Sequence, residues 1–102
     1  MSYYLDITDV KILAGNWLRL WFSDGAIIDV DAGPIIATGE VFEPIRSDRA
    51  VFEAVAVNPE SGTIEWPGEV DLCPDVLYGR GEPASGKRFE RRVVRPAAGA
   101  PA

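Results

Sequence analysis

Apolar and polar residues alternate most regularly over residues 17–22, which read WLRLWF. In an extended chain successive side chains point to opposite sides, so this period of two is typical of a β-strand with one buried face. The predicted buried side carries Leu18, Leu20 and Phe22, and the opposite side carries Trp17, Arg19 and Trp21. The pattern therefore predicts a strand whose second side bears two tryptophans and an arginine, either exposed as an aromatic platform for a partner or covered by the first strand or by the C-terminal tail.

A β-hairpin is predicted to join this strand to residues 26–31, because the Asp-Gly pair between them is a strong turn signal. A two-residue loop would place Leu20 opposite Asp29 and mix apolar with charged side chains. A three-residue loop keeps one face apolar and sets Arg19 opposite Asp29. A slip by one residue would turn the whole apolar set outward. We therefore predict the three-residue loop, with Gly25 in the left-handed region.

The other residues before position 80 form short predicted elements. Strands are expected over residues 3–13, 40–45, 52–57 and 62–66. Single helical turns are expected within residues 32–38, 47–51 and 74–78, begun by Pro34, by Ser47 or Asp48, and by Pro74. The loop over residues 58–62 would pair Val57 with Ile64 and Val55 with Trp66, and Trp66 is expected in the core. These elements predict an α+β domain over residues 3–79, with a small, mainly antiparallel sheet of five to six short strands and two or three single-turn helices.

Size and composition allow one domain with one core, since the chain has 102 residues, of which 47% are apolar and 10% aromatic. The sequence contains no apolar run long enough to span a membrane as a helix. Its N-terminus lacks the basic start and apolar stretch of a secretory signal. We therefore expect a cytoplasmic protein.

The residues that usually carry catalysis are scarce in this sequence. There is no histidine, and Cys73 is the single cysteine. This composition excludes catalytic units that need histidine, an internal disulfide and an all-cysteine metal site. Asp29 and Asp31 could form a carboxylate pair for metal binding or acid–base catalysis, but a solvated face with Arg19 as partner explains them better. We expect Cys73 to be a small buried packing residue, and we predict a non-enzymatic protein without a cofactor or metal ion.

Charge divides the chain into an acidic body and a basic end. Residues 1–79 carry a net charge of −10 and residues 80–102 a net charge of +4, within an overall charge of −6. Stretches rich in Gly, Pro, Ser and Ala flank the segment KRFERRVVR, so we predict a flexible basic tail over residues 80–102. This segment could bind nucleic-acid phosphates, an acidic protein, or the acidic body of its own chain. Its candidate binding residues are Lys87, Arg88, Phe89, Arg91 and Arg92.

A set of spaced motifs in residues 3–79 resembles a small bacterial family known as domain of unknown function 2442. The family shows a strand that ends in Phe-x-Asp-Gly, a Phe-led strand, a Gly-x-Ile-x-Trp strand and a closing Asp-Leu-x-Pro-x-x-Leu-Tyr. The matching residues are Phe22, Asp24, Gly25, Phe52, Gly62, Ile64, Trp66, Asp71, Leu72, Pro74, Leu77 and Tyr78. The turn after the Trp strand departs from the family's Trp-Pro-Asn-Gly pattern, because Gly68 and Glu69 follow Pro67 here.

The resemblance implies a small binding module and leaves the biochemical activity open. Members of the family look like interaction domains, and many are encoded beside another small protein in arrangements similar to toxin–antitoxin pairs. We therefore expect a protein-interaction module, antitoxin-like, with the product of an adjacent gene as partner and homodimerisation as a further possibility. Its expected contact surface is the strand side that bears Trp17, Arg19 and Trp21, together with the basic tail. The alternative is a nucleic-acid-associated regulator that acts through the tail alone.

Overall fold

Seven strands form two antiparallel sheets in the computed structural model, which describes residues 5–79 and 88–97. The four-stranded sheet has the order β1-β2-β3-β7, and the three-stranded sheet has the order β4-β5-β6. The strands are β1 (Ile7–Ile12), β2 (Trp17–Phe22), β3 (Ile27–Asp31), β4 (Ala56–Asn58), β5 (Thr63–Trp66), β6 (Val70–Asp71) and β7 (Arg91–Arg95). The helices are α1 (Gly33–Ile36), the 3-10 turn η1 (Glu40–Phe42), α2 (Glu43–Ser47), α3 (Arg49–Glu53) and α4 (Pro74–Tyr78). The predicted α+β class is confirmed.

The β2–β3 hairpin has the predicted register. Leu20 lies opposite Ile28, and Arg19 lies opposite Asp29. The three-residue loop is closed by hydrogen bonds from the Phe22 amide to the Ala26 carbonyl and from the Gly25 amide to the Phe22 carbonyl. Gly25 has a φ of 91°, in the region that glycine adopts most easily. The need to keep one face apolar therefore fixes both the loop and the register.

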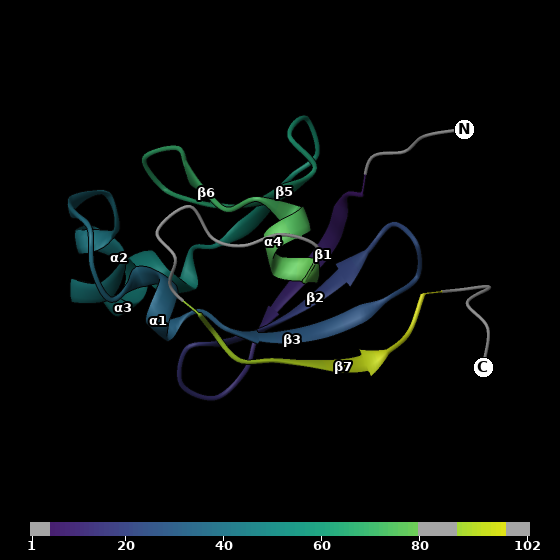
Figure 1. Ribbon diagram of the computed structural model, residues 1–102. Coiled ribbons are helices and arrows are strands. Elements are labelled where there is room, and N and C mark those ends of the chain that lie inside the picture. The colour runs from purple at the N-terminus through teal and green to yellow at the C-terminus, as the bar shows by residue number, and fades with distance from the viewer. Residues whose placement is uncertain (1–4, 80–87, 98–102) are drawn as a thin grey trace.

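The core lies between the two sheets. One face of the four-stranded sheet is covered by the β4-β5-β6 sheet and α4, and α1, α2 and α3 gather at one end (Figure 1). Trp66 is 1% exposed, as expected, and its indole nitrogen donates to the Phe52 carbonyl at 3.0 Å. The other large side chains that are almost fully buried are Phe52, Ile7, Leu18, Leu20, Ile28, Ile45, Ile64, Leu77 and Val30.

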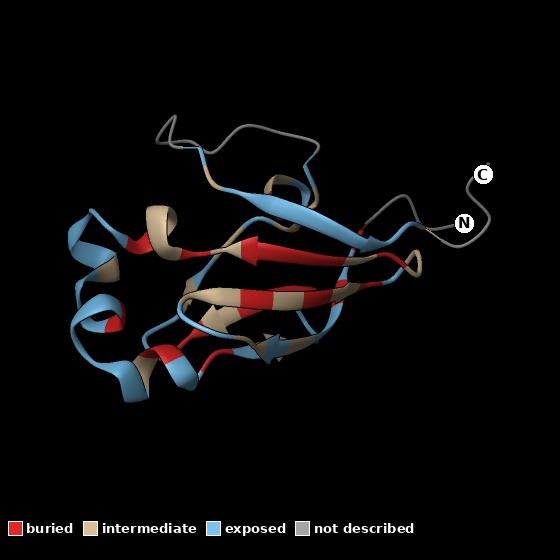
Figure 2. Cartoon of the chain, turned by 90° about the horizontal axis from the view of Figure 1, so that it is seen from below, coloured by how far each residue is buried: buried red, intermediate tan, exposed pale blue. Residues whose placement is uncertain are grey.

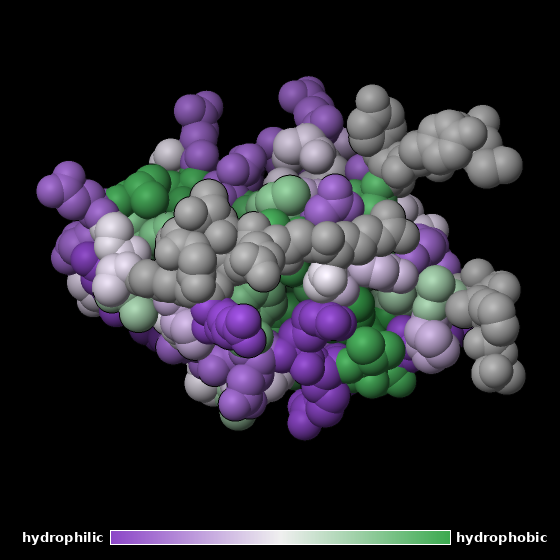
Figure 3. All heavy atoms as spheres, viewed as in Figure 1, coloured by the Kyte–Doolittle hydropathy of each residue, from purple (hydrophilic) through white to green (hydrophobic). Residues whose placement is uncertain are grey.

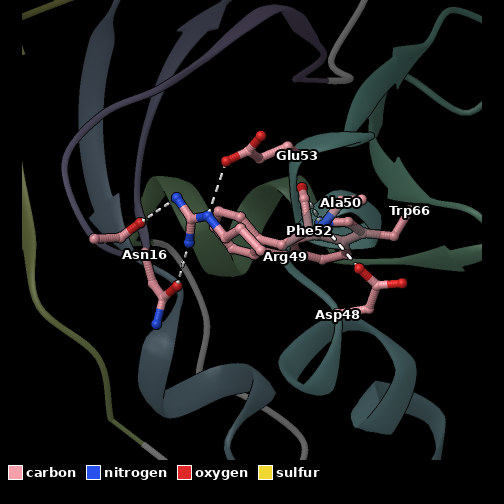
Figure 4. Close-up of polar contacts among 8 residues, drawn as sticks. Asn16, Asp48, Arg49, Ala50, Phe52, Glu53 and Trp66 are labelled. Carbon is pink, nitrogen blue, oxygen red and sulfur yellow. Dashed lines mark hydrogen bonds and ion pairs between the residues drawn. The ribbon is translucent and has the colours of Figure 1, made fainter.

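One arginine ties the helical end of the molecule to the β1–β2 turn. The Arg49 guanidinium donates to the Gly15 carbonyl at 2.8 Å, to Asn16 Oδ1 at 3.0 Å and to Glu53 at 3.0 Å (Figure 4). It also lies over the Phe52 ring, 4.4 Å from the centroid. Asp48 caps α3 through a hydrogen bond from the Ala50 amide, as its position in the sequence predicts. The i,i+4 spacing of Arg49 and Glu53 is a sequence pattern for their ion pair, whereas nothing in the sequence predicts the contacts of Arg49 with Gly15 and Asn16.

Two of the predicted strands are wrong. Residues 40–45 form η1 and the start of α2, because Pro44 occupies the first turn of that helix, where a missing amide hydrogen costs nothing. Residues 52–57 form a strand only from Ala56 onwards, since α3 continues to Glu53. Val57 pairs with Ile64 as predicted, whereas Val55 lies before β4 and does not pair with Trp66.

The C-terminal segment also differs from the expectation of a flexible tail. Residues 91–95 form β7, which pairs antiparallel with β3. The sequence left three binding partners open for this segment: nucleic acid, an acidic protein or the body of its own chain. The structure shows it docked on β3 of its own chain. Positions 80–87 and 98–102 of the predicted tail lie outside the described residues.

The turn that departs from the family pattern is a tight hairpin turn between β5 and β6. Trp66 pairs with Val70, and both Gly68 (φ 91°) and Glu69 (φ 63°) have positive φ. Glutamate rarely adopts this conformation, so Glu69 is a strained position. Among the described residues, none of the helices has the length and apolar character needed to cross a membrane.

Candidate functional site

The face of the four-stranded sheet that points away from the core is the candidate site, and we call it the outer face. Strand register places side chains from all four strands on it. Seen from below, this face has no helix or strand of the described chain in front of it (Figure 2). The residues on the outer face are Asp9, Lys11, Trp17, Arg19, Trp21, Ile27, Asp29, Asp31, Arg92 and Arg95.

A buried carboxylate with two arginines forms the centre of the outer face. Arg19 makes two hydrogen bonds to Asp29, from Nε to Oδ1 at 2.8 Å and from Nη2 to Oδ2 at 3.1 Å. Arg92 reaches Oδ2 of the same carboxylate from β7 with its Nη2 atom, at 3.2 Å. The Asp29 side chain is 0% exposed, whereas Arg19 is 34% and Arg92 68% exposed. The two guanidinium groups therefore cover the carboxylate and present their remaining N–H donors to solvent.

The electrostatics of this group follow from the hydrogen bonds. Those from Arg19, and then from Arg92, lower the pKa of Asp29 below its ordinary value, although burial acts in the opposite direction. The same interaction raises the pKa of Arg19. Asp29 therefore stays deprotonated, and the two positive charges of Arg19 and Arg92 outweigh its single negative charge. A general acid would need the opposite shift, so the lowered pKa argues against that role for Asp29.

Two tryptophans flank this charged centre. Trp17 and Trp21 are both half-buried. Their exposure is therefore intermediate between the two alternatives that the sequence left open, an exposed platform and a covered side. The Arg92 guanidinium lies 5.4 Å from the centroid of the Trp17 ring, a distance suited to a cation–π contact. Asp9 lies opposite Trp21 on β1, and Ile27 lies opposite it on β3. The outer face therefore combines aromatic area with guanidinium groups held in place.

The predicted binding residues do not all meet on this face. Trp17, Arg19, Trp21 and Arg92 come together there, and Lys11 and Arg95, which the sequence did not single out, join them. Arg91 points to the other side of the sheet, where its side chain packs against Gly79. Phe89 is half-buried against the core, and Arg88 is exposed. Lys87 lies outside the described residues.

Cys73 and Asp31 are the other residues that the sequence offered as candidates. Cys73 is exposed, so the prediction of a buried packing residue is wrong. It precedes Pro74 at the start of α4, where an extended backbone turns its side chain outward. Asp31 accepts a hydrogen bond from the Gly33 amide at 2.9 Å, whereas Asp29 accepts from Arg19 and Arg92.

Some hollows lined by described residues lie outside the outer face, and two of them are close to arginines. One, of about 270 Å³, includes Arg46 and Arg49, whose guanidinium groups donate to backbone carbonyls of the chain itself. The other, of about 410 Å³, lies between the end of α4 and the inner side of β7, with Tyr78, Arg91 and Val93 in its wall. The Tyr78 hydroxyl donates to Asp24 and so holds α4 against the β2–β3 turn.

Comparison with known protein families gave a match over most of the chain. The model of the family described as protein of unknown function, DUF2442, matches residues 7–83. The chain belongs to this family. The match spans β1 to α4 and ends before β7, so the strand that supplies Arg92 lies beyond the part that the DUF2442 model covers. Neither the curated proteins nor the solved structures gave a match.

Proposed function

We propose that this DUF2442 protein is a non-catalytic protein-binding module whose contact surface is the outer face. The observation that carries the proposal is the pairing of two half-buried tryptophans with two guanidinium groups anchored on one buried carboxylate. Tryptophan and arginine are the residues most enriched among the energetic centres of protein interfaces. A partner small protein, such as the product of an adjacent gene in an antitoxin-like pair, is the proposed ligand.

Preorganisation is the physical reason why this surface suits binding. Arg19 and Arg92 are held by Asp29, so fewer side-chain rotamers are left to fix when a partner arrives. The outer face also differs in charge from the rest of the body. Four bases and three acids share it, whereas the whole chain, which includes Arg92 and Arg95, carries a net charge of −6. The local excess of positive charge favours a partner with acidic residues among its apolar contacts.

The test is co-expression with the product of the adjacent gene, followed by measurement of complex mass and affinity. We expect a stable stoichiometric complex, weakened at least tenfold by Trp21→Ala. Val41→Ala is the matched control, because Val41 is 56% exposed and lies in η1, outside the four-stranded sheet. Absence of a complex, or equal affinity of the wild type and a folded Trp21→Ala variant, would overturn the proposal.

Nucleic acid is the other class of ligand that the basic segment suits. Arg88, Arg91 and Arg95 are exposed, whereas Arg92 shares Asp29 with Arg19. Binding of this kind falls steeply between 50 and 200 mM salt, with a slope set by the number of phosphates contacted. Tight, salt-sensitive binding of a single-stranded oligonucleotide that is lost with residues 80–102 would favour the regulator over the protein-binding module.

A further inference from the structure

The outer edge of β7 is the least protected part of the four-stranded sheet. β7 is the last strand in the order β1-β2-β3-β7, and all five of its residues are exposed. Val93 is 52% and Val94 47% exposed, which makes them two of the three exposed large hydrophobic residues in the described chain. In Figure 3 a hydrophobic area bordered by hydrophilic atoms lies over β7. Exposed valines on an edge strand are open to pairing by another strand.

The backbone of β7 is set up to accept such a strand. The Asp31 amide donates to the Glu90 carbonyl at 2.9 Å, which makes these two residues a hydrogen-bonded pair of the antiparallel ladder. Along an antiparallel strand the inward-pointing and outward-pointing backbone groups alternate. The N–H and C=O groups of Arg92 therefore point towards β3, and those of Arg91 and Val93 point away from the sheet. These outward groups are the attachment points for a further strand.

Charge selects which strand could pair here. Three of the five β7 residues are arginines. In the described part of the chain no carboxylate pairs with Arg91 or Arg95, whereas Arg92 is held by Asp29. Two copies of β7 side by side would bring these arginines together, and like charges across a strand pair are destabilising. An acidic strand with apolar residues at alternate positions would instead set its acidic side against Arg92 and Arg95 and its apolar side against Val93.

We propose that β7 binds an extended acidic segment of the partner, which adds to the four-stranded sheet as a fifth strand. This inference deepens the proposed function and rests on it, because it names the kind of partner segment and its place beside the outer face. Backbone hydrogen bonds to Arg91 and Val93 provide affinity, and the arginines select acidic side chains. Val93 and Arg95 lie on opposite faces of the sheet, so side chains on both sides of the added strand would contact β7.

The direct test uses a short fluorescein-labelled peptide, Glu-Val-Glu-Thr-Glu-Val-Glu, with the full-length protein. We expect fluorescence anisotropy to show saturable binding that weakens as salt is raised. Amide hydrogen exchange should slow at Arg91 and Val93 when the peptide is added, because their N–H groups become hydrogen-bonded. Two control peptides are expected to bind at least tenfold more weakly: one with lysine in place of glutamate, and one with proline in place of the valines and threonine, which cannot complete a ladder.

The matched protein variants are Val93→Pro and Val93→Thr. Proline at position 93 removes an outward N–H and leaves the hydrogen bonds to β3 in place, and threonine keeps that N–H with a similar shape. We expect Val93→Pro to lose at least tenfold in peptide affinity and Val93→Thr to retain it. The two variants must show the same exchange protection at Asp31, which reports that β7 is still docked on β3.

The outcomes separate this inference from the proposed function. If Trp21→Ala weakens the partner complex and a docked Val93→Pro variant does not, the partner uses the outer face without the β7 edge, and the inference fails alone. If the adjacent gene product does not bind at all, the proposed function fails first. Equal binding of the acidic peptide and its proline-containing counterpart would overturn the added-strand geometry. Binding of an oligonucleotide in place of the peptide would overturn the choice of an acidic segment.

Discussion

Arg92 donates to the buried carboxylate of Asp29 at 3.2 Å, although the two residues are 63 positions apart in the sequence. This hydrogen bond joins the C-terminal strand to the middle of the sheet. Arg19, from the neighbouring strand β2, holds the same carboxylate. Asp29 therefore connects three adjacent strands through side chains as well as through the backbone ladder, and it fixes both guanidinium groups of the outer face.

The first prediction concerns the removal of this charge by Asp29→Asn. The substitution keeps the shape of the side chain but leaves two guanidinium groups without an anionic acceptor. A charged hydrogen bond contributes about 1.5–3 kcal/mol, and exposure of both arginines to water reduces that value. We expect the free energy of unfolding in urea to fall by about 1–2 kcal/mol.

Asp9→Asn is the control for that prediction, because Asp9 is an exposed acid on the same face. It should change the free energy of unfolding by less than about 0.5 kcal/mol. Equal stability of the Asp29→Asn variant and the wild type would mean that the charge of Asp29 contributes nothing to the fold.

The second prediction concerns pH. Because the pKa of Asp29 is lower in the folded protein than in the unfolded chain, the unfolded state takes up a proton first as pH falls. The stabilisation from Asp29 is therefore fully present above the unfolded pKa of about 4 and is lost as pH falls towards the folded pKa. Urea titrations from pH 7 to pH 3 should show a steeper loss of stability for the wild type than for Asp29→Asn. Parallel curves for the two proteins would contradict the sign of the shift.

The hairpin shows how much of the fold the sequence can predict. The alternation of Leu18, Leu20 and Phe22 allows one register with a continuous apolar face, and that requirement predicted both the three-residue loop and the contact between Arg19 and Asp29. Local signals also predicted a helical turn capped by Ser47 or Asp48, and Asp48 is the residue that caps α3. These features depend on residues close in the chain, where one physical constraint decides between few alternatives.

The wrong elements are those with two competing local signals. In residues 40–45, Pro44 suits both an edge strand and the first turn of a helix, and in the structure it lies in the first turn of α2 with Ile45 buried in the core. The place of β7 depends on a partner strand more than sixty residues away in the sequence. Charge alone could not predict which acidic residue would pair with Arg92. The contact of Arg19 with Asp29 could therefore be predicted from the sequence, and that of Arg92 with Asp29 could not.

The third prediction concerns the turn at Gly25. Its φ of 91° disfavours a β-branched residue, so Gly25→Val should lower the free energy of unfolding by about 1 kcal/mol or more. Gly25→Asn is the matched variant, because asparagine tolerates positive φ better than other residues with a β-carbon. Urea unfolding should rank the three proteins as wild type, Asn and Val in order of decreasing stability. A valine variant as stable as the asparagine variant would show that the backbone strain has been relieved by a different loop.

The fourth prediction has the opposite sign and concerns Glu69, whose φ is 63°. Replacement by asparagine or glycine removes the conflict between the side chain and the left-handed backbone. Glu69→Asn should raise the free energy of unfolding by about 0.5–1 kcal/mol. Glu60→Asn is the control, since Glu60 is exposed in the turn between β4 and β5 and has no positive φ. A destabilised Glu69→Asn variant would indicate that the glutamate makes a contact that outweighs its strain.

The last prediction is that a chain ending at residue 87 folds but is less stable than the full chain. Among the described residues the fully buried core side chains lie between Leu5 and Leu77, and the DUF2442 match ends before β7, so the truncated chain retains most of the core and loses Phe89, which packs against it. Without β7, however, β3 becomes an edge strand and Asp29 keeps only Arg19 as a partner. We expect the free energy of unfolding to fall by about 1–3 kcal/mol. Full-length Arg92→Ala should show a smaller loss, because it removes the charge contact and keeps the backbone ladder. If the truncated chain were as stable as the full chain, docking of β7 on β3 would add no net stability. In that case β7 would be undocked in part of the population, and β3 would then be the free edge of the sheet.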